Sequence, residues 1–104
     1  MMKVIKKLFT TACLVIFLFP ISALAQGLNR GELLVSMCVT CHGPDGQGSK
    51  RIPALDNHTV QELTEYMNGF KDGTESATIM DRHAISYSDE EINLIAKYFY
   101  EARQ

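Results

Sequence analysis

The stretch MCVTCHGPDGQGSK, residues 37–50, places two cysteines three positions apart, a histidine directly after the second, and three glycines just beyond. In a helix Cys38, Cys41 and His42 stand at positions i, i+3 and i+4, so both thiols and the imidazole leave the same face. The glycines allow the following backbone to turn tightly and to approach a ligand. This spacing suits a flat ligand held at the end of a helix.

The run C-x-x-C-H is the attachment signature of c-type haem, in which the thiols add across two vinyl groups and the histidine binds the iron. We therefore expect one haem c, covalently bound by Cys38 and Cys41, with His42 as the proximal iron ligand. A covalent haem would also supply the apolar centre that a small domain lacks.

Other uses of the two cysteines fit the sequence less well. A dithiol redox site normally begins a helix in a fold with a sheet, and no strand pattern is visible. A structural zinc site needs four ligands, and His42, His58 and His83 lack the paired spacing. A chance disulfide is the remaining alternative.

The first 25 residues have the three parts of a secretory signal peptide. These are a basic head (Lys3, Lys6, Lys7), an apolar run (8–19) and a small-residue cleavage site (Ala23, Leu24, Ala25). The rival is an uncleaved membrane anchor, but the apolar run is short for a span and Pro20 interrupts it. We expect cleavage after Ala25, export to the periplasm, and one domain over residues 26–104.

Cleavage would leave 79 residues with seven Lys and Arg against twelve Asp and Glu, a net charge of −5. This acidity and the absence of a basic stripe argue against nucleic acid as a partner. The charge suits docking to a basic patch on another protein. Cys13 would leave with the signal peptide, so only the close pair of cysteines would remain.

Three segments begin with a capping residue followed three positions later by Glu, which predicts helix starts. The pairs are Asn29 with Glu32, Thr59 with Glu62, and Ser88 with Glu91. Apolar residues at helical spacing follow each start: Leu33, Leu34 and Met37; Leu63, Tyr66, Met67 and Phe70; Ile92, Ile95, Ala96 and Phe99. Long loops are expected over 43–58 and 72–87. The predicted fold is all-α, with three or more helices wrapped around one haem.

An electron-carrying haem iron usually has a sixth ligand, for which the candidates are Met37, Met67, Met80, His58 and His83. Met37 and Met67 lie at apolar helical positions and are expected in the core. Met80 lies in the second long loop, where a polar stretch gives no packing reason for a methionine, so it is favoured. His83 could replace it by a slip of the loop, and His58 is interpreted as a surface or capping residue.

The IPAL stretch carries the remaining predicted site residues. Pro53 lacks an N–H but keeps its carbonyl, which can accept the Nδ1 proton of His42 and orient the ring. A simple rigid turn explains Pro53 equally well. Ile52 and Leu55 are expected to wall the haem pocket.

In their order along the chain, the C-x-x-C-H motif, IPAL, the loop methionine and YSDEEINLIAKYF resemble the small mono-haem cytochrome c family. The resemblance implies His42 and Met80 as axial ligands, support of His42 by the Pro53 carbonyl, and crossing of the first and last helices. Gly31 and Leu34 would then contact Tyr98 and Phe99.

A closer resemblance is to the haem subunit of flavocytochrome c sulfide dehydrogenases, through IPAL, GFKDG, IMDRHA and SDEEI. LDNH after IPAL and the extra His83 depart from that pattern. Neither long loop presents a nucleophile with a base or a pair of close carboxylates, so we expect a carrier of single electrons without substrate chemistry of its own, served by redox protein partners. The alternative is the haem subunit of a complex that accepts electrons from a flavoprotein subunit, and a third hypothesis is a haem sensor of small gases.

Overall fold

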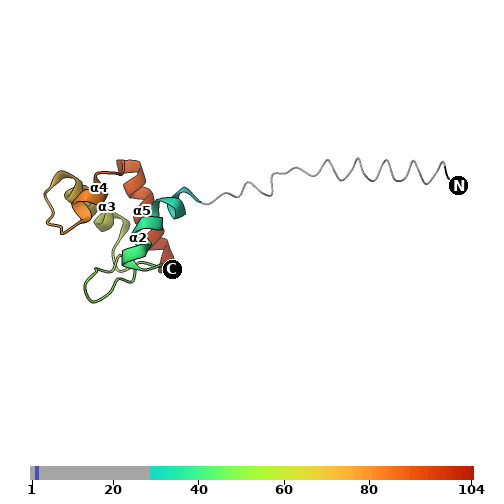
Figure 1. The fold of residues 1–104 in the computed structure, drawn as a ribbon, viewed down its shortest axis with the longest axis horizontal. Coiled ribbons are helices and arrows are strands. Elements are labelled where there is room, and N and C mark those ends of the chain that lie inside the picture. The colour runs from blue at the N-terminus through green and yellow to red at the C-terminus, as the bar shows by residue number, and fades with distance from the viewer. Residues whose placement is uncertain (1, 3–28) are drawn as a thin grey trace.

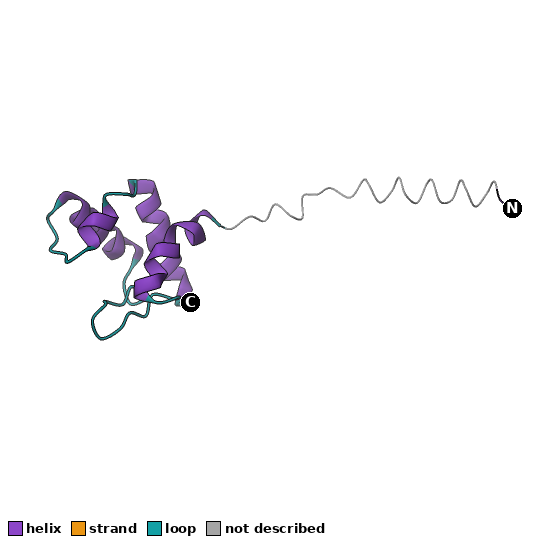
Figure 2. Cartoon of the chain, viewed as in Figure 1, coloured by secondary structure: helices purple, strands orange, loops and turns teal. Residues whose placement is uncertain are grey.

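The structure, a computed structural model, describes residue 2 and residues 29–104. Four helices occupy the described part of the chain: α2 (Arg30–His42), α3 (Val60–Asp72), α4 (Met80–Ala84) and α5 (Asp89–Ala102). Figure 2 shows helices and loops without a strand over these residues, which confirms the all-α class. The predicted signal peptide, apart from Met2, lies outside the described residues. Within them, no helix has the length and apolar character needed to cross a membrane.

The three predicted helix starts are all present as capping boxes. The Asn29 side chain accepts from the Gly31 N–H at 3.0 Å, and Glu32 accepts from the Asn29 N–H at 3.2 Å. Thr59 and Ser88 make the same reciprocal pairs with the Glu three positions on. Each box satisfies two backbone donors that a helix start would otherwise leave without a partner.

The expected loop over 72–87 is partly wrong, because it contains the short helix α4. Ile79, the residue before this helix, makes no side-chain capping hydrogen bond. The five residues of α4 are too few to show a helical pattern of apolar positions, and no capping residue marks the start of this helix. The first expected loop, 43–58, is free of helix, as predicted.

Helix α5 lies between α2 and α3 and contacts both, while α4 packs on α3 (Figure 1). The predicted apolar stripe of α5 forms the centre of the core, and Phe99 and Ile92 are completely buried. Burying a side chain of this size stabilises the fold by about 1.5–3 kcal/mol. The buried residues form two clusters: Val35, Leu63, Ile95, Ala96 and Phe99 in one, and Met67, Ala84 and Ile92 in the other.

The predicted apolar face of α2 is only partly correct, because Leu34 packs against the core while the other two residues do not. Leu33 and Met37 are 55% and 63% exposed, and Val35 is the apolar residue of this helix that is buried. In α3, Leu63 and Met67 are buried as expected, but Tyr66 is 42% exposed.

The expected crossing of the first and last described helices is present. A methyl group added at Gly31 would lie 3.9 Å from the Leu94 carbonyl oxygen, so the α2 backbone comes close to α5. Leu34 and Tyr98 both pack against the cluster that contains Phe99. Small and apolar residues at the crossing thus bring the beginning of α2 onto α5.

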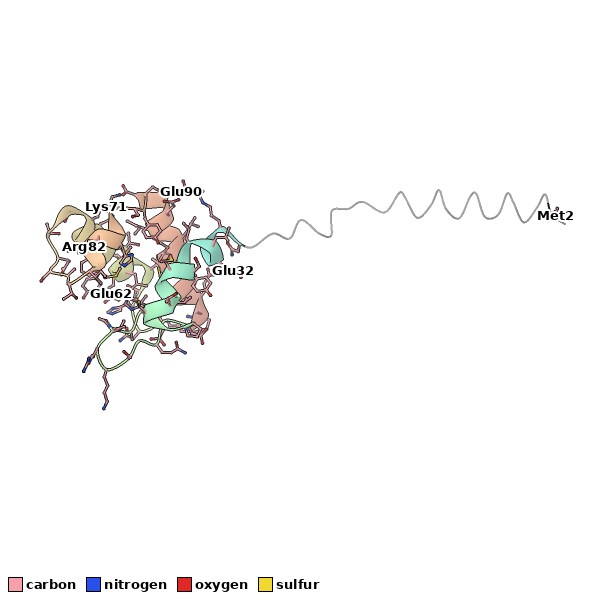
Figure 3. All side chains as sticks on the ribbon, viewed as in Figure 1. Met2, Glu32, Glu62, Lys71, Arg82 and Glu90 are labelled. Atoms are coloured by element: carbon pink, nitrogen blue, oxygen red, sulfur yellow. The ribbon has the colours of Figure 1, made fainter. Side chains whose placement is uncertain are left out.

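A lysine ties the end of α3 to the start of α5. Lys71 Nζ donates to the Tyr87 carbonyl at 2.9 Å and to Asp89 Oδ1 at 3.1 Å. Figure 3 shows Lys71 and Glu90 at this same end of the domain. These two hydrogen bonds join the residue just before the α4 segment to residues just after it. The segment that contains α4 is therefore a loop whose two ends are held together.

Candidate functional site

The predicted attachment residues lie at the carboxyl end of α2. Cys38 packs partly buried against the core, Cys41 is exposed, and His42 is only 8% exposed. Both thiols are free. Gly43 ends the helix immediately after His42. The structure therefore brings two thiols that share no disulfide and one imidazole together within the last turn and a half of one helix.

The imidazole of His42 is held by the segment that the sequence singled out. Its Nδ1 lies 2.7 Å from the Pro53 carbonyl oxygen, the contact expected from the sequence. A carbonyl can only accept, so Nδ1 carries the proton in this hydrogen bond. The other ring nitrogen, Nε2, then keeps its lone pair, which is the form that binds a metal ion.

The electrostatics of Cys38 argue against a dithiol redox site. Burial raises the pKa of the Cys38 thiol, a hydrogen bond with its own backbone offsets part of the rise, and the neighbouring Cys41 adds to it. Redox-active cysteines usually have a lowered pKa, because the thiolate is the reactive form. The pKa of Cys38 is instead shifted upward, mainly by burial.

Tyr87 is a residue near this site that the sequence reading missed. Tyr87 and Cys38 pack against the same core cluster. Burial raises the pKa of the Tyr87 hydroxyl, and Cys38 and Glu91 raise it further. Its ring packs against both core clusters. The sequence did contain a pattern that could have identified Tyr87. An apolar residue just before a helix cap often packs against the residue four positions after the cap, here Ile92, and this pair is called a hydrophobic staple.

Ile52 and Leu55 lie on either side of the Pro53 carbonyl. The Ile52 carbonyl accepts from the Ser49 N–H at 2.8 Å, and the Leu55 N–H donates to the Gly46 carbonyl at 2.6 Å. The Leu55 side chain packs against the core cluster of Phe99. Both residues thus flank the support of His42, and their role as walls of a haem pocket stays a prediction.

Met80 is the first residue of α4, not part of an irregular loop. It is partly buried and packs against Met67, Ala84 and Ile92, so the expectation that packing gives no reason for a methionine here was wrong. A thioether side chain fills an irregular apolar gap well. Its role as the sixth ligand stays a prediction.

The other ligand candidates fall into different surroundings. Met67 is buried in the core, as expected, whereas Met37 is exposed, contrary to expectation. His58 lies edge-on to Tyr66, with ring centroids 5.5 Å apart, next to the Thr59 cap. His83 is exposed on α4, three residues after Met80.

A zinc site finds no support in the described part of the chain. No group of three or more His, Cys, Asp or Glu side chains there could hold a metal ion. The donor set fits a covalently attached haem instead: two free thiols that can add to vinyl groups, and one imidazole whose tautomer leaves Nε2 for iron.

Comparison with known proteins agrees with this chemistry. Residues 28–101 match the model of the family described as "Cytochrome c". The chain is 42% identical over 71 residues to the cytochrome subunit of sulfide dehydrogenase from Chlorobaculum tepidum, covering 68% of this chain and 64% of that protein.

Two other relatives are small cytochromes covered over most of their length. Cytochrome c-554(548) of Halomonas halodenitrificans is 37% identical over 66% of this chain and 88% of its own. Cytochrome c-553 of Nitratidesulfovibrio vulgaris is 33% identical over 74% of this chain and 85% of its own. The chain thus belongs to the cytochrome c family, whose members carry electrons on covalently attached haem c.

Proposed function

We propose that this protein passes single electrons through one haem c attached to Cys38 and Cys41, with His42 and Met80 as axial ligands. The observation that carries the proposal is the 2.7 Å contact between His42 Nδ1 and the Pro53 carbonyl, next to two free thiols. It gives the imidazole a fixed tautomer and a fixed direction before any iron binds. Bound haem c would supply an iron that alternates between Fe(III) and Fe(II).

The residues of the chain have separate tasks in this proposal. Cys38 and Cys41 would hold the haem, each thiol adding its S–H across one vinyl group, which requires no oxidant. His42 offers Nε2 from one side. Met80 offers a thioether sulfur, which raises the reduction potential relative to a second histidine. The Pro53 carbonyl keeps the His42 ring in place, and Ile52 and Leu55 would wall the haem pocket beside it.

Two single variants of the haem-loaded protein test the ligand assignment. Met80→Ala should keep the haem covalently attached, lower the reduction potential and change the absorption bands that report ligation. His83→Ala, on the same short helix, is the matched control and should leave both properties unchanged. An unaltered spectrum in Met80→Ala would remove Met80 from the proposal, and a change in His83→Ala would point to the histidine instead.

The same variants address the gas-sensor alternative. A firm Met80 bond resists displacement, so the reduced native protein should bind carbon monoxide poorly and Met80→Ala should bind it readily. Ready binding to the native protein would favour the sensor.

We further infer that the chain performs no chemistry on a substrate and acts only as a carrier.

Export to the periplasm is also part of the proposal, with residues 1–25 as a cleaved signal peptide and residues 26–104 as the working domain. The support is the basic head, apolar run and small-residue site of the sequence. N-terminal sequencing of the exported protein tests it: a first residue at Gln26 supports cleavage, and a start at Met1 contradicts it.

A second candidate function is that of the haem subunit of a sulfide-oxidising complex with a separate flavoprotein. One relative, matched over less than two thirds of its length, is named as the cytochrome subunit of sulfide dehydrogenase. Another, from Stutzerimonas stutzeri, is named as a thiosulfate dehydrogenase electron acceptor and is 34% identical over 65% of this chain and 33% of its own. Both names point to redox partners that oxidise inorganic sulfur.

Size-exclusion chromatography of the native extract, monitored for haem and flavin absorbance together, separates the two functions. Haem alone at the size of a small monomer supports a free carrier. Haem and flavin eluting together at a larger mass support the complex, and sulfide is then the first electron donor to test.

A further inference from the structure

The hydrogen bond that orients His42 depends on where the Pro53 carbonyl lies. Pro53 belongs to the irregular segment between α2 and α3, so no helix or strand fixes its position. Pro53 itself is exposed. The carbonyl must therefore be held by backbone contacts from the neighbouring loop.

Gly48 makes part of these contacts, beside the Ser49–Ile52 and Gly46–Leu55 backbone hydrogen bonds. Its φ is +70°, a conformation that side-chain-bearing residues rarely adopt. A methyl group added there would lie 2.5 Å from the Ile52 carbonyl oxygen, 2.7 Å from the Pro53 carbonyl carbon and 2.6 Å from the Ala54 nitrogen. All three are backbone atoms, so no rotation of a side chain can make room. The segment that carries the Pro53 carbonyl lies directly on the Gly48 α-carbon.

The same glycine is tied to the other partner of the hydrogen bond. The Gly48 N–H donates to the carbonyl oxygen of His42 at 2.7 Å. Gly48 thus contacts the backbone of His42 through its N–H and the backbone around Pro53 through its α-carbon. This glycine therefore helps to set the distance between the imidazole and the Pro53 carbonyl, together with the Ser49–Ile52 and Leu55–Gly46 backbone hydrogen bonds.

We propose that Gly48 is a positioning residue for His42: it places the Pro53 carbonyl at hydrogen-bonding distance from Nδ1 and so sets how strongly Nε2 donates to the haem iron. This rests on the proposed role of His42 as a ligand. A hydrogen bond from the far ring nitrogen makes a metal-bound histidine a stronger electron donor. A stronger donor favours Fe(III) and lowers the reduction potential.

The chain offers a matched control in Gly73, which ends α3. Its φ is +82°, so alanine there meets the same kind of backbone strain, but an added methyl group would have nothing within 4 Å. Gly48→Ala and Gly73→Ala therefore share the strain and differ in the collision with the Ile52–Ala54 backbone. A third variant, Gly48→Asn, keeps the collision while asparagine tolerates a positive φ, so it guards against simple failure to fold.

The experiment uses the haem-loaded protein and measures the reduction potential together with NMR exchange of the His42 Nδ1 proton. Gly48→Ala and Gly48→Asn should raise the potential and speed proton exchange about tenfold, the factor for losing about 1.4 kcal/mol of hydrogen bonding. Gly73→Ala should lose stability but leave the potential and the exchange rate at native values.

Potentials and exchange rates in both Gly48 variants equal to those of Gly73→Ala would overturn the positioning role. Failure of the proposed function has a different signature. It would show as native protein without covalent haem, or as His42→Ala with a native spectrum. If His42→Ala changes the spectrum but the Gly48 variants keep the native potential and exchange rate, only the positioning role of Gly48 is rejected.

Discussion

The ring of Phe99 lies directly against the α-carbon of Gly46: a methyl group added there would come within 2.7 Å of Phe99 Cδ1 and 3.1 Å of Leu55 Cβ. Gly46 is buried, and its carbonyl accepts from the Leu55 N–H at 2.6 Å. The loop that follows the C-x-x-C-H motif is thereby seated on the centre of α5.

Gly46→Ala should destabilise the fold by about 1–3 kcal/mol, because the added methyl group overpacks against Phe99 and because the φ of +77° is strained for alanine. The check is urea unfolding of the haem-loaded protein. The contact should also appear in a double-mutant cycle: Gly46→Ala combined with Phe99→Leu should cost clearly less than the sum of the two single variants. Strict additivity would mean that the ring and the loop do not press on each other.

Phe99 is also the largest completely buried side chain of the domain. Phe99→Ala should lower the free energy of unfolding by about 3–5 kcal/mol, because it removes apolar burial and leaves a cavity. Lys97→Ala, exposed on the same helix, is the control and should stay within about 0.5 kcal/mol of the native value. A loss below about 1 kcal/mol for Phe99→Ala would contradict the described core.

Lys71 is expected to stabilise the domain more through the Tyr87 carbonyl than through its ion pair. Lys71→Met should cost about 1–2 kcal/mol, since it removes the donor to a partly buried carbonyl. Asp89→Asn removes only the charge of an 86% exposed partner and should cost at most about 1 kcal/mol. Thermal unfolding at low and high salt checks this, and a Lys71→Met loss that disappears in high salt would assign the effect to the ion pair.

The capping boxes predict how stability changes in acid. Hydrogen bonds from the Thr59 and Ser88 backbone N–H groups hold the pKa values of Glu62 and Glu91 below their ordinary 4.5, with Arg30 assisting at Glu91. A lowered pKa in the folded state gives stability that is present above pH 4.5 and is lost as the pH falls through the folded pKa.

Replacing Glu62 and Glu91 with Gln keeps a side-chain acceptor at each cap but removes the titrating carboxylate. The free energy of unfolding of this double variant should therefore fall less steeply below pH 4.5. The measurement is thermal unfolding across that pH range, and Glu101→Gln at the exposed far end of α5 is the control. An acid profile of the double variant as steep as that of the native protein would show that other groups govern the acid transition.

The sequence specified the helix starts well because a capping box is a local pattern: the bonds of Ser88 and Glu91 involve residues three apart. Local patterns also identified the thiols and His42. Pro53 was proposed because proline keeps its carbonyl while lacking an N–H, although a rigid turn explained it equally well, and the structure places that carbonyl 2.7 Å from His42 Nδ1.

The failures came from contacts between distant residues. Helix α2 is apolar on several sides, and only the position of α5 decides that Val35 is buried and Met37 exposed. Met80 looked unexplained because its neighbours, Met67 and Ile92, come from two other helices. The backbone contacts of Gly48 are equally invisible in the sequence, since glycine patterns do not say what lies opposite.

The placement of α5 between α2 and α3 has a consequence for the order of events during biosynthesis. Arg30 at the start of α2 pairs with Glu90 and Glu91, sixty and sixty-one residues later. A chain emerging from its N-terminus cannot close this core until α5 has also emerged. Cys38, which the finished core partly covers, therefore stays open to modification for as long as the chain is incomplete.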